Sequence, residues 1–306
     1  MSVGEHEMRH DLLVYDSDDG FARFVGLFVE EGLEAGHPTV VVTGPHQRAV
    51  LTDTLTAADA EAVRFIDRDS FYTRPEKALA DYDAILRGLV SQGAEAVRLY
   101  GELPDDKVAE DWASWLRYEA GINRLFAEQP IWVTCGYDAR RLPQEVLDGA
   151  WRAHREVHLH GWRENPHYED PVHVARSLSP AYAELAGLRS LPVVEGEAAL
   201  RHLLARELES AGVDADVASE MLTAAVAVLV NAQQHGGGLR SLRTGRVEGR
   251  FVCEIADAGP GLDDPFAGYL PPRRRGDPAG LWRARQLTAG LDLLSPGTGL
   301  TVRLWV

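Results

Sequence analysis

The feature that most constrains the fold is an alternation, between residues 10 and 135, of short apolar runs with segments of helical periodicity. The run at 39–42 is continuous, as in strands that lie buried in a parallel sheet. We predict strands at 10–15, 38–43, 63–66, 94–100 and 130–135, and helices at 19–35, 76–92 and 107–128. This order predicts a doubly wound α/β domain.

Several polar or reactive side chains lie near the predicted strand ends, and open α/β sheets bind ligands at the carboxyl ends of their strands. The candidate pocket consists of His10, Tyr15, Glu102, Cys135, Tyr137, Asp138 and Arg140. The loop after the second strand, residues 43–48, lacks the second glycine and the lysine of a phosphate-binding P-loop. We therefore do not expect this domain to be an NTPase.

A second pattern lies in the last third of the chain, where an amide on an apolar helix precedes an acidic strand end. Asp214 is a plausible N-cap for the helix that carries Asn231, and a strand at 250–257 ends in Asp257 before the glycine-rich turn at 258–261. An amide can ligate Mg²⁺, a carboxylate can accept a hydrogen bond from an exocyclic amine, and glycines leave room for a flat base. The pattern predicts a nucleotide site, although both side chains could be simple caps.

Two further features leave alternatives open. Residues 273–275 are three consecutive arginines that could meet phosphates or an acidic partner, or form a solvated loop. His154 and His158 stand at the i, i+4 spacing of a helix with His160 just beyond, which could hold a transition metal. The alternative is a polar helix end and an exposed connector. A short helix is expected at 177–186.

Residues 8–175 resemble the MEDS sensory domain, a RecA-like module with a degenerate P-loop. The resemblance rests on segments 10–17, 31–36, 99–102, 115–119 and 135–140, which include His-Asp-Leu-Leu-Val-Tyr-Asp-Ser at the start and Cys-Gly-Tyr-Asp-Ala-Arg at the end. The resemblance implies a domain that is built on a RecA-like parallel sheet and senses a small-molecule ligand.

Residues 196–306 resemble the GHKL ATPase fold, in the RsbW-like branch of anti-sigma factors and serine kinases. Asn231 matches the family's Mg²⁺-binding asparagine, and Asp257 matches its adenine-reading aspartate. Segments 280–287 and 299–304 look like its second glycine motif and its last strand. The resemblance implies an α+β sandwich that binds ATP and Mg²⁺, and often a homodimer. Its nucleotide site would comprise Asn231, Asp257, Gly259, Gly261, Gly280, Leu281 and Thr301, with Arg273, Arg274 and Arg275 in a lid.

Two departures from the family pattern weaken the expectation of catalysis. Ala227 stands four residues before Asn231, where the family has the glutamate that polarises the attacking group. Losing a general base costs about 10² to 10⁴ in rate. The first glycine of the second motif falls on Pro278, which has no backbone N–H for a phosphate. We therefore expect no catalytic residue in this domain.

Length and charge fit a chain of two ordinary domains. At 306 residues, we predict a sensory domain at 1–178, a linker at 179–195 and the ATPase-like domain at 196–306. The formal charge of −16 disfavours a nucleic-acid surface and favours a protein partner with basic patches. Cys135 and Cys253 lie in separate apolar runs, which indicates a reducing compartment. Without a signal-peptide pattern or an apolar run near 18 residues, we expect a cytoplasmic protein with no membrane contact.

The order of the two resemblances is that of RsbA-type anti-sigma regulators. It implies a protein that senses a ligand and binds a sigma factor or an anti-anti-sigma protein. One alternative is an active serine kinase that uses ATP and Mg²⁺. The other is a small-molecule sensor whose GHKL-like half only dimerises.

Overall fold

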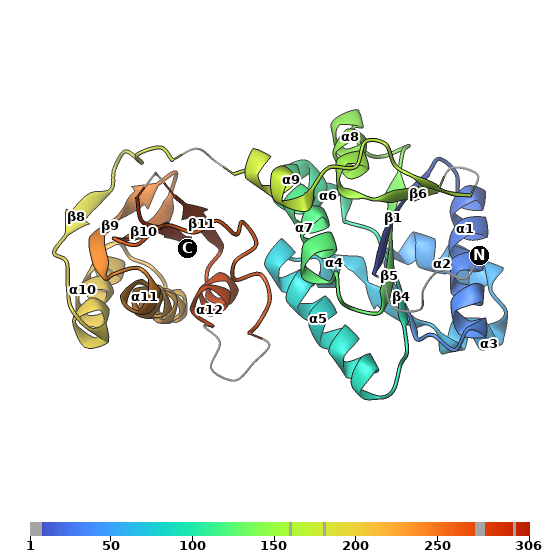
Figure 1. Ribbon diagram of the computed structural model, residues 1–306, viewed down its shortest axis with the longest axis horizontal. Coiled ribbons are helices and arrows are strands. Elements are labelled where there is room, and N and C mark those ends of the chain that lie inside the picture. The colour runs from blue at the N-terminus through green and yellow to red at the C-terminus, as the bar shows by residue number, and fades with distance from the viewer. Residues whose placement is uncertain (1–7, 159–160, 180–181, 273–278, 296–297) are drawn as a thin grey trace. The chain divides into compact units, whose positions relative to one another are not determined.

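The computed structural model describes residues 8–158, 161–179, 182–272, 279–295 and 298–306 (Figure 1). The chain divides into two compact units, Met1–Leu178 and Ser179–Val306, and each is described by itself.

The N-terminal unit is a mixed α/β structure on a seven-stranded, mostly parallel sheet. Its strands are β1 (Arg9–Tyr15), β2 (Thr39–Thr43), β3 (Arg64–Asp67), β4 (Val97–Gly101), β5 (Ile131–Asp138), β6 (Glu156–His158) and β7 (Trp162–Glu164). Its helices are α1 (Asp18–Glu34), α2 (Pro45–Thr54), α3 (Ala57–Ala62), α4 (Arg68–Phe71), α5 (Pro75–Ser91), α6 (Asp105–Glu110), α7 (Trp112–Leu125), α8 (Gln144–Ala153) and α9 (Pro171–Ser177). The order in the sheet is β3-β2-β4-β5-β1-β6-β7, with only β7 antiparallel to its neighbour.

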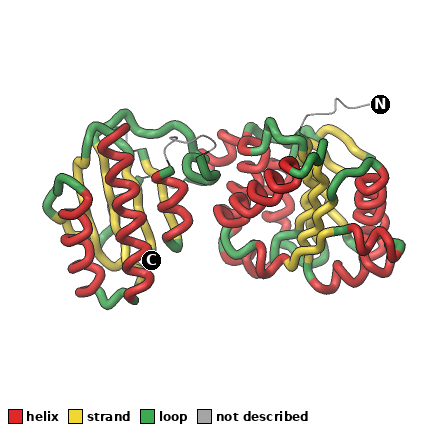
Figure 2. Tube along the Cα trace, turned by 90° about the horizontal axis from the view of Figure 1, so that it is seen from below, coloured by secondary structure: helices red, strands yellow, loops and turns green. Residues whose placement is uncertain are grey.

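Helices cover both faces of this sheet, as Figure 2 shows (helices red, strands yellow). One layer contains α1 to α3, and α5, α7, α8 and α9 pack together on the other side. Helix α1 begins where the Ser17 hydroxyl accepts a hydrogen bond from the backbone N–H of Gly20 at 3.2 Å. Its buried stripe, which includes Phe21, Val25 and Phe28, packs on the sheet because these residues recur at helical spacing. The five predicted strands are confirmed.

Three local predictions for this unit are wrong. The helix expected at 107–128 is two helices, because Asp111 leaves helical geometry (φ −151°, ψ 72°) and caps α7 through the N–H of Ser114. The histidine pair is not on one helix, since α8 ends at Ala153 and His158 lies on β6. The last helix, α9, is capped by Asp170 and ends at Ser177, where the short helix was expected to begin.

Over its described residues, the C-terminal unit is a five-stranded antiparallel sheet with three helices (Figure 1). Its strands are β8 (Arg189–Leu191), β9 (Leu239–Val247), β10 (Arg250–Asp257), β11 (Gly290–Leu294) and β12 (Thr301–Trp305). Its helices are α10 (Glu197–Ser210), α11 (Ala215–His235) and α12 (Gly280–Leu287). The order in the sheet is β11-β12-β10-β9-β8. Strand β8 lies inside the predicted linker at 179–195, so that part of the linker belongs to the sheet.

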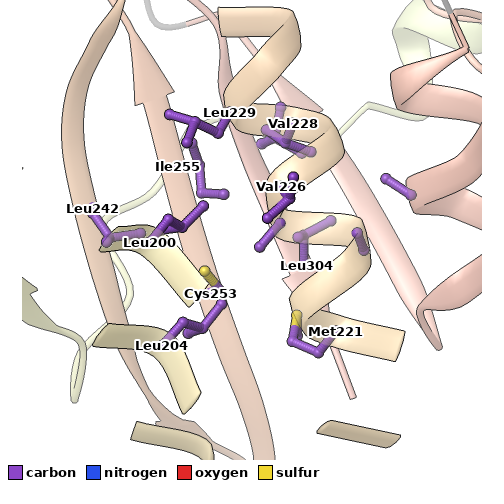
Figure 3. Close-up of a cluster of buried hydrophobic side chains, with 14 of the residues drawn as sticks. Leu200, Leu204, Met221, Val226, Val228, Leu229, Leu242, Cys253, Ile255 and Leu304 are labelled. Carbon is purple, nitrogen blue, oxygen red and sulfur yellow. The ribbon is translucent and has the colours of Figure 1, made fainter. Parts of the chain in front are cut away.

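Helix α11 is the centre of the C-terminal core. Figure 3 shows its Met221, Val228 and Leu229 with Leu200 of α10 and Ile255 of β10 in one buried cluster. Burying such a side chain stabilises the fold by about 1.5–3 kcal/mol. The helix is also long and apolar enough to cross a membrane, contrary to the expectation that no such run exists. This is weak evidence for a span, because the core helix of a soluble protein passes the same test.

Candidate functional site

A pocket of about 380 Å³ opens in the C-terminal unit where α11, the end of β10 and α12 meet. Asn231 of α11 and Asp257 of β10 both line it. The rest of the wall is mostly apolar and comes from α12 and the loops around it: Pro260, Gly261, Leu262, Ala267, Gly268, Leu270, Pro272, Leu281, Trp282 and Leu300, with His235 and Gly236 beside Asp257. The pocket is therefore mostly apolar, with polar side chains from Asn231, His235 and Asp257 in its wall.

The Asp257 carboxylate is fixed by the backbone around it. Its Oδ1 accepts hydrogen bonds from the N–H of Gly259 at 3.0 Å and the N–H of Leu300 at 2.8 Å. A Cβ at Gly236 would collide with the carboxylate, and a Cβ at Gly299, where φ is +75°, would collide with the Asp257 carbonyl. These two glycines are therefore required for the carboxylate to reach its place at the pocket wall.

The predicted nucleotide-binding residues do not all line this pocket. Asn231, Asp257, Gly261 and Leu281 do. The remaining three have other places. A Cβ on Gly259 would lie 2.8 Å from Gly236 Cα, so it allows two backbones to pack. Gly280 packs against the Ala227 carbonyl and lines a neighbouring cavity, and Thr301 is buried in β12 opposite Ala256. The predicted lid, Arg273, Arg274 and Arg275, and Pro278 lie outside the described residues.

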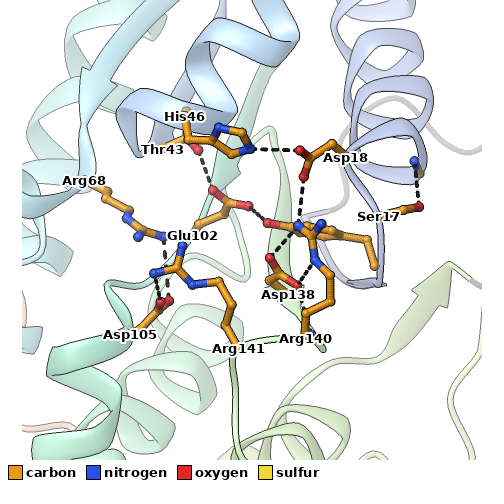
Figure 4. A network of polar contacts seen from close by, with 12 residues as sticks. Ser17, Asp18, Thr43, His46, Arg68, Glu102, Asp105, Asp138, Arg140 and Arg141 are labelled. Atoms are coloured by element: carbon orange, nitrogen blue, oxygen red, sulfur yellow. Dashed lines mark hydrogen bonds and ion pairs between the residues drawn. The ribbon is translucent and has the colours of Figure 1, made fainter.

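In the N-terminal unit, part of the predicted sensory pocket forms a polar network at the carboxyl ends of the central strands (Figure 4). Tyr15, at the end of β1, donates a hydrogen bond to Glu102 Oε1 at 2.6 Å, and Thr43 at the end of β2 donates to Glu102 Oε2. Asp138, at the end of β5, binds the Arg140 guanidinium, with Oδ2 and Nη2 2.7 Å apart. The strand ends thus meet at one sheet edge, as expected of parallel strands.

Glu102 is the buried acid of this network, with 3% of its surface exposed. Burial raises the pKa of its carboxyl, although the hydroxyl groups of Thr43, Tyr15 and Tyr100 oppose that rise by donating to the charged form. The folded protein therefore binds a proton at Glu102 more tightly than the unfolded chain does. Its contribution to stability is present below the unfolded pKa and is lost as pH rises through the folded pKa.

Replacing Glu102 by glutamine is expected to change stability in a pH-dependent way. The uncharged amide avoids the cost of burying a carboxylate. The free energy of unfolding of the variant should therefore increase relative to that of wild type as pH rises from about 4 to about 8, by about 1.4 kcal/mol per unit by which folding raises the Glu102 pKa. Urea unfolding at both pH values measures the difference. Glu61→Gln on α3 is the control, since Glu61 is exposed. If the difference in unfolding free energy between Glu102→Gln and wild type did not change with pH, Glu102 would not be a buried acid with a raised pKa.

The other part of the predicted sensory pocket lies in the interior, away from this network. His10 of β1 and Cys135 and Tyr137 of β5 surround Glu119 of α7. The Tyr137 hydroxyl donates to Glu119 Oε1 at 2.8 Å. Together with His154, the C-cap of α8, these side chains form a cluster that is at most 5% exposed.

Sequence reasoning did not select Glu119, and it paired His154 with the wrong histidine. A local signal for Glu119 exists: it is an acidic residue on the apolar face of α7, which also carries Trp115 and Ile122. No pattern in the sequence around His154 indicates that this residue joins the cluster around Glu119. His158 packs against Phe24 instead, with ring centroids 4.1 Å apart, and His160 lies outside the described residues.

Residues 9–155 match the family model of MEDS, the methanogen/methylotroph, DcmR sensory domain. The match covers most of the N-terminal unit and just under half of the chain. It indicates a signalling or sensor role for that unit. No curated protein matches the chain.

Proposed function

We propose that the protein is a cytoplasmic regulator of the RsbA type, in which the MEDS-like unit senses a small molecule and the C-terminal unit is a GHKL domain. The C-terminal unit would bind ATP with Mg²⁺ and, in a nucleotide-dependent shape, a sigma factor or an anti-anti-sigma protein. The protein would have no nucleic-acid or membrane partner and would pair as a homodimer through this unit.

The observation that carries the nucleotide part is that Asn231 and Asp257 line one pocket. They belong to a helix and a strand that are joined by β9, and 26 positions separate them in the sequence. Asp257 Oδ2 can accept from an exocyclic amine because Oδ1 is occupied by two backbone N–H groups. The apolar wall from Leu262 and Leu300 would cover the faces of a purine.

Mg²⁺ and the phosphates would lie toward the start of α12. A Cβ on Gly280, the first residue of α12, would be 3.6 Å from Asn231 Cβ, so the helix begins beside that amide. Backbone N–H groups at a helix N-terminus favour phosphate, and an amide oxygen suits Mg²⁺. Asn231 would hold the metal, which would screen the phosphate charge, and Gly280 and Leu281 would face the phosphates.

The same geometry supports binding without phosphotransfer. Ala227 lies on α11 one turn before Asn231, with its carbonyl against Gly280, and no carboxylate occupies that position. Without a general base, the expected rate loss is about 10² to 10⁴. We therefore place the protein among regulators that bind a nucleotide to control a partner.

Calorimetry of the full-length protein with ATP and Mg²⁺ tests this function. We expect micromolar binding in wild type and a loss of about 100-fold or more in Asp257→Asn, because the new amide would point a donor at the adenine amine. Asp263→Asn, outside the pocket wall, is the control. Absence of binding at millimolar ATP would overturn the nucleotide proposal and leave a scaffold for protein contacts.

A phosphotransfer assay distinguishes the proposed regulator from an active serine kinase. Wild type should transfer no phosphate to a serine-containing anti-anti-sigma partner, and Ala227→Glu should gain transfer if the missing carboxylate is the reason. Transfer by wild type at a rate comparable with that of Ala227→Glu would favour the kinase.

A further inference from the structure

Four buried side chains from four separate elements converge inside the N-terminal unit. They are His10 of β1, Glu119 of α7, Cys135 of β5 and His154 at the end of α8. Their exposed fractions are 2%, 1%, 5% and 0%. Each offers one ligand atom, and all four of these atoms lie within 4.8 Å of one another.

Four of the six distances between these ligand atoms match those around one metal ion. Glu119 Oε2 is 3.3 Å from His10 Nε2, 3.3 Å from Cys135 Sγ and 3.5 Å from His154 Nε2. His10 Nε2 is 3.3 Å from Cys135 Sγ. Ligands about 2.0–2.3 Å from a tetrahedral Zn²⁺ are separated from one another by about 3.3–3.8 Å. The other two distances, which both involve His154 Nε2, are at most 4.8 Å, so His154 would move toward His10 and Cys135 when an ion binds.

Hydrogen bonds to the Nδ1 atoms of His10 and His154 orient both imidazole rings so that their Nε2 atoms face the centre of the cluster. His154 Nδ1 lies 2.7 Å from the Ala150 carbonyl, which can only accept, so Nδ1 carries the proton. Asn123 donates its Nδ2 to the Ala153 carbonyl at 2.6 Å, which leaves its Oδ1 to accept from His10 Nδ1 at 3.3 Å. Both Nε2 lone pairs consequently face Glu119. Hydrogen-bond partners of this kind orient histidine ligands in metal sites.

Without a cation, the lone pairs at the centre of the cluster are poorly compensated. The Cys135 thiol can donate its one proton to Glu119, and His154 Nε2 has no hydrogen-bond partner among the described residues.

We propose that His10, Glu119, Cys135 and His154 form a tetrahedral Zn²⁺ site. The charges balance, since one carboxylate and one thiolate neutralise the dication and the two imidazoles add none, which suits a buried location. Four protein ligands fill the coordination sphere, as in structural zinc sites. The ion would tie β1 and β5 to α7 and α8.

One cavity in the N-terminal unit is lined in part by His10, a member of this cluster. It measures about 680 Å³ and is lined by residues that include His10 and Asn123. A metal ion could enter from it, and a small molecule bound there would lie beside a ligand of the ion. The zinc site does not depend on the nucleotide proposal, because it belongs to the other unit and has a separate readout.

Cobalt substitution tests the site on the full-length protein without a polyhistidine tag. After chelation under reducing conditions, wild type should bind one Co²⁺ per chain with tetrahedral d–d bands and a thiolate-to-cobalt charge-transfer band. Zn²⁺ should displace it. A wild type without a stoichiometric tetrahedral spectrum would overturn the proposal and leave the cluster as a hydrogen-bonded network.

Substitutions at the proposed ligands, compared with control variants, test where the ion binds. Cys135→Ser should remove the charge-transfer band, and His154→Asn should weaken Zn²⁺ binding by at least about 100-fold. Cys253→Ser alters the other buried thiol and His173→Asn an exposed histidine, so both should bind as wild type does. A band that survives in Cys135→Ser, or is lost in Cys253→Ser, would place the metal elsewhere and overturn the assignment. Circular dichroism identifies any variant that fails to fold, and the wild-type spectrum with the two control variants then decides.

Discussion

Replacing Arg303 by methionine is expected to destabilise the C-terminal unit by about 3 kcal/mol. Arg303 of β12 is 5% exposed, and its Nε donates to Glu254 Oε2 of β10 at 2.7 Å. Glu254 is 2% exposed, and among the described residues the variant would leave this buried carboxylate with Arg243 Nη1 as its one cationic partner, 3.4 Å from Oε1. Arg303 also donates to the Ala183 carbonyl, so the variant would loosen the segment before β8.

Hydrogen exchange of peptides from β10 and β12 measures this effect in the C-terminal unit separately from the rest of the chain. Arg250→Met is the matched control, because Arg250 is exposed at the start of β10 and should change stability by less than about 0.5 kcal/mol. The double variant Arg303→Met/Glu254→Met should recover most of the loss, since it removes the uncompensated charge. Equal effects of the single and double variants would show that the ion pair is not the cause.

Replacing Gly136 by alanine is expected to destabilise the N-terminal unit by about 3 kcal/mol, the upper end of overpacking costs. Gly136 lies on β5 against Tyr100 of β4, and a Cβ there would collide with the Tyr100 hydroxyl and lie 2.6 Å from its Cζ. Tyr100 is fully buried and donates to Glu102 at 2.9 Å, so the ring cannot move aside without breaking that bond.

Gly88→Ala is the control for Gly136→Ala and should have the opposite sign. Gly88 lies within α5, and a Cβ there has open space, so alanine should stabilise the helix by about 0.5–1 kcal/mol. Urea unfolding followed by circular dichroism compares the two variants with wild type. A Gly136→Ala protein as stable as wild type would mean that Tyr100 and the Glu102 network can rearrange at little cost.

The local pattern of the sequence predicts most of the regular structure correctly. The strand at 250–257 is found with the predicted bounds, and Asp214 caps α11 through the N–H groups of Asp216 and Val217. These features depend on residues within one or two turns of one another. The break between α6 and α7 was missed because a single side chain, Asp111, ends one helix and caps the next.

In the candidate sites too, some features could be predicted from the local sequence, and others depend on the tertiary structure. Glycines near Asp257 and the apolar run before Asn231 were visible in the sequence, because each signal is local. That the two side chains share a pocket depends on how α11 packs on β10. In the N-terminal unit, the sequence supplied one set of seven residues, and the structure separates it into the Glu102 network at the sheet edge and the Glu119 cluster in the interior.

The sequence by itself determined strands β1 to β5 and β10 and the long helices α1, α5 and α11, because periodicity and capping act over a few residues. Only the tertiary structure decided which polar side chains meet. His10, Glu119, Cys135 and His154 are brought together by the sheet order β5-β1-β6 and by the packing of α7 and α8 on it. Contacts between residues so far apart in the chain depend on strand order and helix packing, which no local pattern specifies.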